Sequence, residues 1–178
     1  MIVIAAGVVV AAAAASRRAR THRLKEHFGP EYDRTVFEAA DRKAAEKELT
    51  TRERKRSKLE IRPLTHDEQA AFTRHWQTVQ TGFVDDPSSA LGDADRLVTA
   101  IMRERGYPVD DFEQRAADIS VDHPSVVENY RAAHGIHLSQ QKGDVGTEVQ
   151  RQAFVHYRTL FEQLLETENH QTRSQEAS

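Results

Sequence analysis

The sequence predicts an all-α protein with an N-terminal membrane helix, a long charged helical spacer and a four- to five-helix bundle. Three observations lead to this prediction. Apolar residues recur at spacings of three and four, no stretch alternates steadily between apolar and polar residues, and 30% of the 178 residues are charged while only 7% are aromatic. The expected divisions are an anchor over 1–16, a spacer over 17–62, a bundle over 63–166 and a disordered tail over 167–178.

The N-terminal residues 1–15 are apolar without interruption. As a helix they would rise about 22 Å, which is short of the roughly 30 Å hydrocarbon layer, so the span must recruit Ser16 or thin the bilayer locally. A cleaved signal peptide is the alternative, because alanines precede Ser16, but no basic residue precedes Ile2. We therefore expect residues 1–16 to form a transmembrane anchor, with a secreted mature chain or a buried core helix as the alternatives.

Basic residues follow the apolar run at once, and none precedes it. By the positive-inside rule this pattern places the N-terminus outside the cell and the rest of the chain in the cytoplasm. The basic side chains are expected to contact lipid headgroups. These residues are Arg17, Arg18, Arg20, Arg23 and Lys25.

Charge divides the remaining chain near Pro63. Residues 17–62 carry 15 Lys and Arg against 9 Asp and Glu, a net charge of +6, whereas residues 63–178 carry 10 against 19, a net charge of −9. Residues 31–60 are rich in helix-forming charged residues and poor in apolar ones. This composition predicts a long solvent-exposed helix that acts as a stalk, or one that is partnered by another chain.

The bundle begins with a capping box in which Thr65 and Glu68 satisfy each other's backbone amides. The apolar face of the helix that follows contains Trp76, which we expect in the core rather than at a ligand or partner site. Its other apolar members are Phe72, Val79 and Phe83.

Four more helices are predicted from their end signals. Pro87 starts the second helix and Gly106 ends it, and a capping-box spacing from Asp110 to Glu113 starts a short third helix. A fourth helix is expected to open at residues 122–124, and a final one at Thr147. Short linkers between them favour antiparallel neighbours in a bundle.

Candidate sites are few. The absence of cysteine excludes a disulfide framework, a thiol nucleophile and a zinc ribbon. His134 and His137 are three residues apart and could share a helical face with His123 nearby, which makes these three the candidate metal ligands. The pattern is weak because no HExxH motif accompanies it. We predict no catalytic residue and no cofactor.

The carboxylates around His123 are the other cluster with possible chemistry. Together with Ser120 they leave open a metal-binding or hydrolytic enzyme that uses residues 118–137, although Asp110 and Asp122 lie where helix caps are expected. The basic run over residues 52–58 contains a glutamate, lacks neighbouring aromatic residues and precedes an acidic domain, all of which argues against nucleic acid.

Residues 103–131, together with 28–33 and 61–64, resemble a group of uncharacterised actinobacterial proteins. Those proteins have an N-terminal hydrophobic anchor, a charged linker and a helical C-terminal domain, so the resemblance implies this architecture and no activity. The sequence therefore predicts a membrane-anchored, cytoplasm-facing helical protein that serves as a protein-interaction or scaffold module.

Overall fold

A computed structural model describes the backbone of residues 2–39, 41–143 and 145–176, and the side chains of 15–39, 41–143 and 145–166. Over this part the chain forms eight α-helices and no strand, which confirms the predicted all-α class. In the described residues no helix is both long and apolar enough to cross a bilayer. The predicted anchor over 1–16 lies almost entirely in residues whose side chains the structure does not describe. The same holds for the whole of the predicted tail over 167–178.

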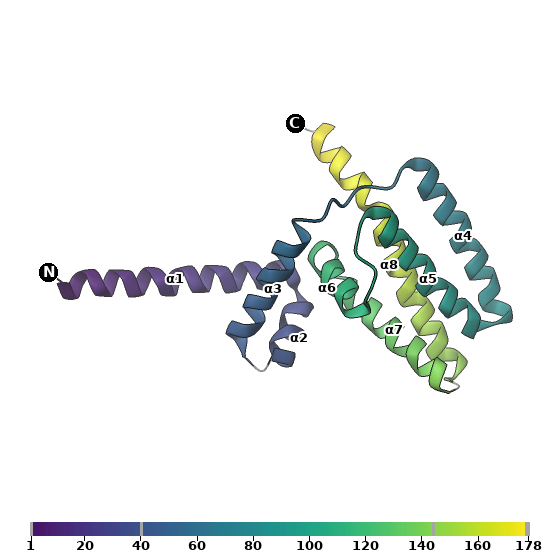
Figure 1. The fold of residues 1–178 in the computed structure, drawn as a ribbon, viewed down its shortest axis with the longest axis horizontal. Helices are drawn as coiled ribbons and strands as arrows, with labels where there is room; N and C mark the ends of the chain where they lie inside the picture. The colour runs from purple at the N-terminus through teal and green to yellow at the C-terminus, as the bar shows by residue number, and fades with distance from the viewer. Residues whose placement is uncertain (1, 40, 144, 177–178) are drawn as a thin grey trace.

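The first three helices form a small N-terminal unit, which comprises α1 (Ile2–Phe28), α2 (Pro30–Ala39) and α3 (Arg42–Arg56). Figure 1 shows α1 projecting away from the rest of the molecule, with α2 and α3 folded back at its C-terminal end. Gly29 has a φ of +50°, the left-handed conformation that glycine adopts without a steric penalty, and the chain turns there.

The prediction of one long exposed helix over residues 31–60 is wrong. The stretch is broken near Asp41, whose side chain caps α3 by accepting hydrogen bonds from the amides of Lys43 and Ala44. Tyr32 and Leu49 are buried against Leu24 and Phe28 of α1, so these two apolar residues of the stretch have partners that lie before it in the sequence.

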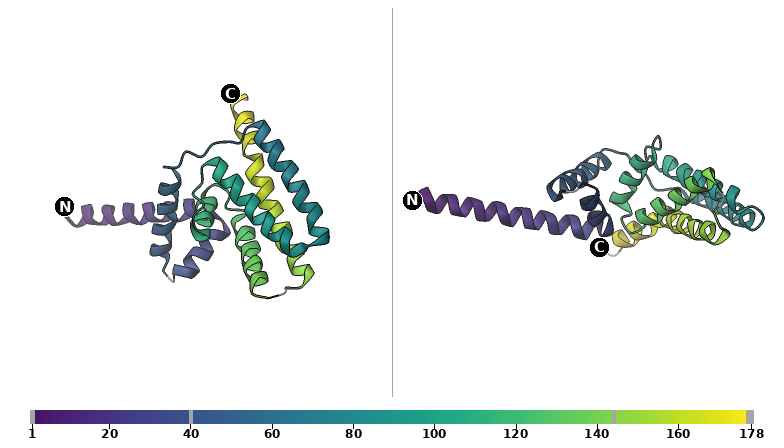
Figure 2. Two further views of the ribbon diagram at one scale, coloured as in Figure 1. Left: turned by 45° about the vertical axis from the view of Figure 1, so that its right-hand side comes forward. Right: turned by 90° about the horizontal axis from the view of Figure 1, so that it is seen from below.

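The larger unit is a helical bundle. It contains α4 (His66–Asp85), α5 (Pro87–Arg105), α6 (Phe112–Asp122), α7 (Val127–Lys142) and α8 (Thr147–Glu176). The long helices α4, α5, α7 and α8 lie side by side, and the short α6 lies between them and the N-terminal unit (Figures 1 and 2). Trp76 is only 5% exposed and stacks on Phe154 and Phe161 of α8, at ring-centroid distances of 5.1 and 4.7 Å, which confirms its place in the core.

The predicted helix ends are mostly correct. Thr65 and Glu68 form the capping box, and Gly106 ends α5 with a φ of +97°. Two starts are corrected. Asp111, not Asp110, caps α6, and Asp122 is the last residue of α6 rather than the opening of the next helix. Asp122 instead joins α3 to the bundle, because its carboxylate accepts hydrogen bonds from Arg56 and from the hydroxyl of Tyr107.

Candidate functional site

The five basic residues that follow the apolar run lie on the C-terminal half of α1, and they do not act alike. Arg23 forms a bidentate ion pair with Glu53 of α3, with nitrogen–oxygen distances of 2.6 and 2.9 Å. Arg20 donates a hydrogen bond to the hydroxyl of Thr50. These two arginines therefore fasten α1 to α3. Arg17 and Arg18 are exposed and have no ion-pair partner among the described residues. The ammonium group of Lys25 lies over the ring of Tyr32, 5.3 Å from its centroid.

A cleft of about 890 Å³ opens where α1 crosses the first half of α3, and we call it the α1–α3 cleft. Four of the five predicted basic residues line it, the exception being Arg23. Sequence reasoning missed the other wall, which consists of three cations about 25 residues later. The Lys and Arg residues that line the cleft are Arg17, Arg18, Arg20 and Lys25 of α1, and Arg42, Lys43 and Lys47 of α3.

A buried charge cluster joins the N-terminal unit to the bundle. Glu31 of α2 is 1% exposed and accepts hydrogen bonds from Arg52 of α3 at 2.6 Å and from Arg131 of α7 at 3.1 Å. Burial opposes the charged form of Glu31, but the two arginines outweigh burial and hold its pKa below the ordinary value. The cluster thus contains a buried carboxylate that is fully charged near neutral pH.

Glu128 of α7 extends this cluster, because its carboxyl group lies close enough to that of Glu31 for the two to influence each other's protonation. Burial and the neighbouring Glu31 raise the pKa of Glu128, because two adjacent carboxylates resist both being charged. Arg34 of α2 lies 3.5 Å from Glu128. Helices α2, α3 and α7 are therefore held together by charged groups drawn from both units of the molecule.

The three candidate metal ligands do not form a metal site. His123 is buried at the C-terminal end of α6, where burial and nearby Arg105 lower its pKa to about 4. His134 and His137 lie together on α7 with ring centroids 6.4 Å apart. Across the described part of the chain no group of three or more His, Asp or Glu side chains is arranged to hold a metal ion, so the structure gives the metal-site hypothesis for these histidines no support.

His134 makes packing and polar contacts within the bundle. Its ring stacks on Phe112 at 3.7 Å, and its Nδ1 lies 3.6 Å from Oδ1 of Asp95, which also accepts a hydrogen bond from the hydroxyl of Tyr157. Burial opposes the charge of Asp95, but His134 and Tyr157 outweigh it and keep its pKa low. This arrangement ties α5, α7 and α8 together through buried polar groups.

Ser120 offers no nucleophile for a hydrolytic reaction. Its side chain is fully buried in α6, and its Oγ donates to the carbonyl oxygen of Ala117 at 2.6 Å. The same hydroxyl also accepts a hydrogen bond from Nη1 of Arg52 at 3.4 Å, so it is engaged between α3 and α6. The α1–α3 cleft is therefore the candidate functional site in the described part of the molecule.

Models of known protein families, curated proteins and solved structures give no match to this chain. The resemblance to actinobacterial proteins with a similar architecture thus stays a prediction.

Proposed function

We propose that this protein is a single-pass membrane protein whose helical domain is held at the cytoplasmic face and binds another protein there. The observation that carries the proposal is the continuity of α1. This one helix starts at Ile2, within the apolar run, and ends at Phe28, inside the folded N-terminal unit. A membrane helix that continues without a break into a packed unit would fix the position of that unit relative to the bilayer.

Two further features support this arrangement. Leu24 and Phe28 are fully buried against Tyr32 and Leu49, so the last turns of α1 belong to the core rather than to a flexible linker. The basic residues follow the apolar run directly, as the positive-inside rule requires of a cytoplasmic flank.

Membrane attachment is tested by fractionation of cells that express the full chain. The wild type is expected in the alkali-washed membrane fraction. Val9→Arg places a charge in the middle of the apolar run, which costs roughly 2.5–3.5 kcal/mol on the insertion scale, and is expected to move the chain to the supernatant. The matched control Val9→Leu should stay in the membrane. Wild-type chain in the alkaline supernatant would contradict the proposal.

Sidedness is tested with a tag at the C-terminus. The tag should resist protease in intact cells and be lost after the membrane is opened. A mature chain in the medium that begins near Ser16 would instead establish the secreted alternative.

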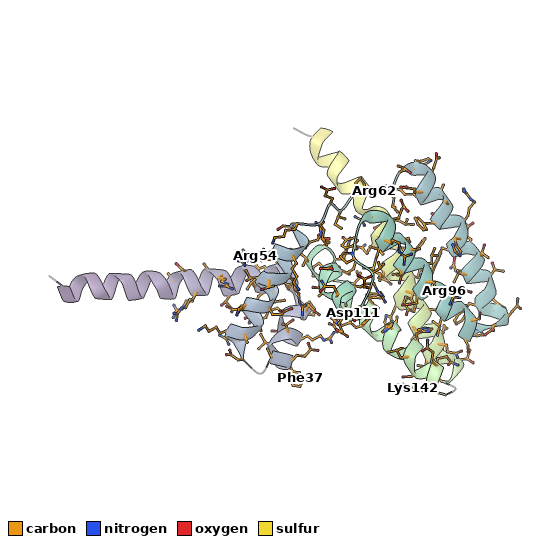
Figure 3. The ribbon with its side chains drawn as sticks, viewed as in Figure 1. Phe37, Arg54, Arg62, Arg96, Asp111 and Lys142 are labelled. Carbon is orange, nitrogen blue, oxygen red and sulfur yellow. The ribbon has the colours of Figure 1, made fainter. Side chains whose placement is uncertain are left out.

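The partner surface that we propose includes α2. Phe37 is 87% exposed near the end of this helix, and Figure 3 shows it at the outer edge of the N-terminal unit. A photo-reactive phenylalanine analogue at position 37 should form one discrete protein adduct in intact cells, and the same analogue at Arg96, which is exposed on α5, should not form it. Identical adducts from both positions, or none from position 37, would contradict the proposal for α2.

A further inference from the structure

We propose that the α1–α3 cleft is a binding site for a ligand that carries two or more phosphate groups. In the described structure the cleft is lined by seven Lys and Arg residues and only two carboxylates, from two helices that face each other across it. This concentration of positive charge lies in a chain whose net charge is −3. The charge of the cleft is thus a local feature and does not follow from the composition of the protein.

The two carboxylates of the cleft are already engaged by neutral donors. Asp41 accepts hydrogen bonds from the backbone amides of Lys43 and Ala44, at 3.3 and 3.0 Å. Glu46 accepts hydrogen bonds from the hydroxyls of Thr21 at 2.6 Å and Tyr32 at 3.0 Å. These contacts hold both carboxylates in place for the fold.

Two of the cations have neutral partners: Arg20 donates to the carbonyl oxygen of Glu46 and the hydroxyl of Thr50, and the ammonium group of Lys25 lies over the ring of Tyr32. In the part of the chain that the structure describes, no carboxylate lies within ion-pair distance of the cleft's lysines or of Arg17, Arg18 and Arg42. Lys43 and Lys47 are also like charges one helical turn apart, an arrangement that destabilises an isolated helix slightly. A bound anion would relieve that repulsion and supply the missing charge.

Phosphate is the anion that this site fits best. Arg and Lys are the side chains that proteins use for phosphate, Arg through paired hydrogen bonds and Lys as a point charge. A single phosphate carries at most two negative charges against the seven cations of the cleft, whereas a ligand with two phosphate groups could contact α1 with one and α3 with the other.

The position of the cleft indicates the source of the ligand. Residues 17–25 span about 12 Å along α1 and begin directly after the apolar run, so on the proposed membrane topology the cleft lies at the depth of the lipid headgroups. We therefore infer that the ligand is the headgroup of an anionic phospholipid with more than one phosphate. This choice of source rests on the proposed function, whereas the phosphate chemistry of the cleft does not.

The test measures binding to the full chain in a neutral detergent. The probes are diphosphatidylglycerol, phosphatidylcholine and inorganic pyrophosphate. The variant Arg42→Gln/Lys43→Gln/Lys47→Gln removes the α3 wall of the cleft without changing the apolar run. The matched control Arg54→Gln/Lys55→Gln/Lys58→Gln removes the same charge from exposed positions at or just beyond the other end of α3, and Figure 3 labels Arg54 there. Circular dichroism checks that both variants keep their helix content, since Gln is a good helix former.

We expect the wild type to bind diphosphatidylglycerol at least tenfold more tightly than phosphatidylcholine. The α3-wall variant should lose at least tenfold of this affinity, and the control less than threefold. Equal losses in the two variants would show that only overall charge matters, and would overturn the proposal. The absence of binding to both diphosphatidylglycerol and pyrophosphate would overturn it as well.

Pyrophosphate separates the two sources of phosphate. If pyrophosphate binds the wild type but not the α3-wall variant while the lipid does not bind, the phosphate site stands and the headgroup assignment is wrong. Fractionation of Val9→Arg reports on the membrane topology independently, so failure of the proposed function and failure of this site give different results.

Discussion

His123 is a buried imidazole with no hydrogen-bond partner for its Nε2 in the described structure. Its pKa of about 4 in the folded chain lies below the value of about 6.5 expected in the unfolded chain. Between these values the unfolded state binds the proton that the folded state excludes, so stability falls as the pH is lowered through this window. We expect His123 alone to remove up to about 3 kcal/mol of stability by pH 4.

The variant His123→Gln isolates this contribution because glutamine does not titrate. Between pH 7 and pH 4.5 the free energy of unfolding of the wild type should fall by about 2 kcal/mol more than that of the variant. Chemical denaturation at the two pH values measures both. Equal losses in wild type and variant would show that the charge on His123 does not affect stability.

Two glycines are expected to respond to alanine in opposite ways. Gly106 has a φ of +97°, and a Cβ there would lie 2.6 Å from the carbonyl oxygen of Glu60, so Gly106→Ala should destabilise the fold by more than about 1 kcal/mol. Gly135 lies exposed within α7 with open space around it, so Gly135→Ala should stabilise by about 0.5–1 kcal/mol. Thermal unfolding gives both signs, and the same sign for both would contradict these roles.

At the scale of elements, Glu31 is the residue through which α2 is bound to both α3 and α7. Its carboxylate is paired with two arginines that are themselves about nine-tenths buried. Glu31→Gln would leave these guanidinium groups without their shared counter-charge, and removal of one partner from a buried ion pair typically costs about 3–5 kcal/mol. We expect a loss of about 3 kcal/mol in unfolding free energy, with faster amide exchange in α2 and α3.

The control for this variant is Glu48→Gln. Glu48 pairs with the same Arg52 but is about half exposed, so its removal should cost less than about 1 kcal/mol. Similar losses for the two variants, or unchanged exchange in α2 and α3 of Glu31→Gln, would mean that the cluster does not bind the two units together.

Elements whose signals are local could be predicted from the sequence, and those that depend on distant partners could not. Thr65 and Glu68 are three residues apart, and their capping box formed as predicted. The stalk prediction failed because Tyr32 and Leu49 pack against α1, and because Glu31 meets Arg131 across 100 positions of sequence. The local pattern in residues 31–60 contains none of these partners.

The candidate site was half predictable for the same reason. The α1 wall of the cleft follows the apolar run directly, so its basic residues stand out in the sequence. The α3 wall is brought to it by the turns at Gly29 and near Asp41. One local signal was present, since Lys43 and Lys47 are like charges at helical spacing.

At the scale of the whole molecule, α1 can set the position of the bundle only if the two behave as one rigid body. The hydrogen bonds of Arg20 and Arg23 join α1 to α3, and the Glu31 cluster joins α2 and α3 to the bundle. A domain attached in this way would keep a fixed orientation at the membrane, whereas a flexible stalk would let it move freely.

The distance between two spin labels in the full chain tests this most directly. The sequence contains no cysteine, so Ala19→Cys on α1 and Arg103→Cys on α5 provide two exposed and unique attachment sites. With the labelled chain in phosphatidylcholine vesicles, we expect a single narrow distance distribution that broadens when Glu31→Gln is added. A broad distribution in the otherwise unchanged chain would contradict the account, because it would show that the bundle moves independently of α1.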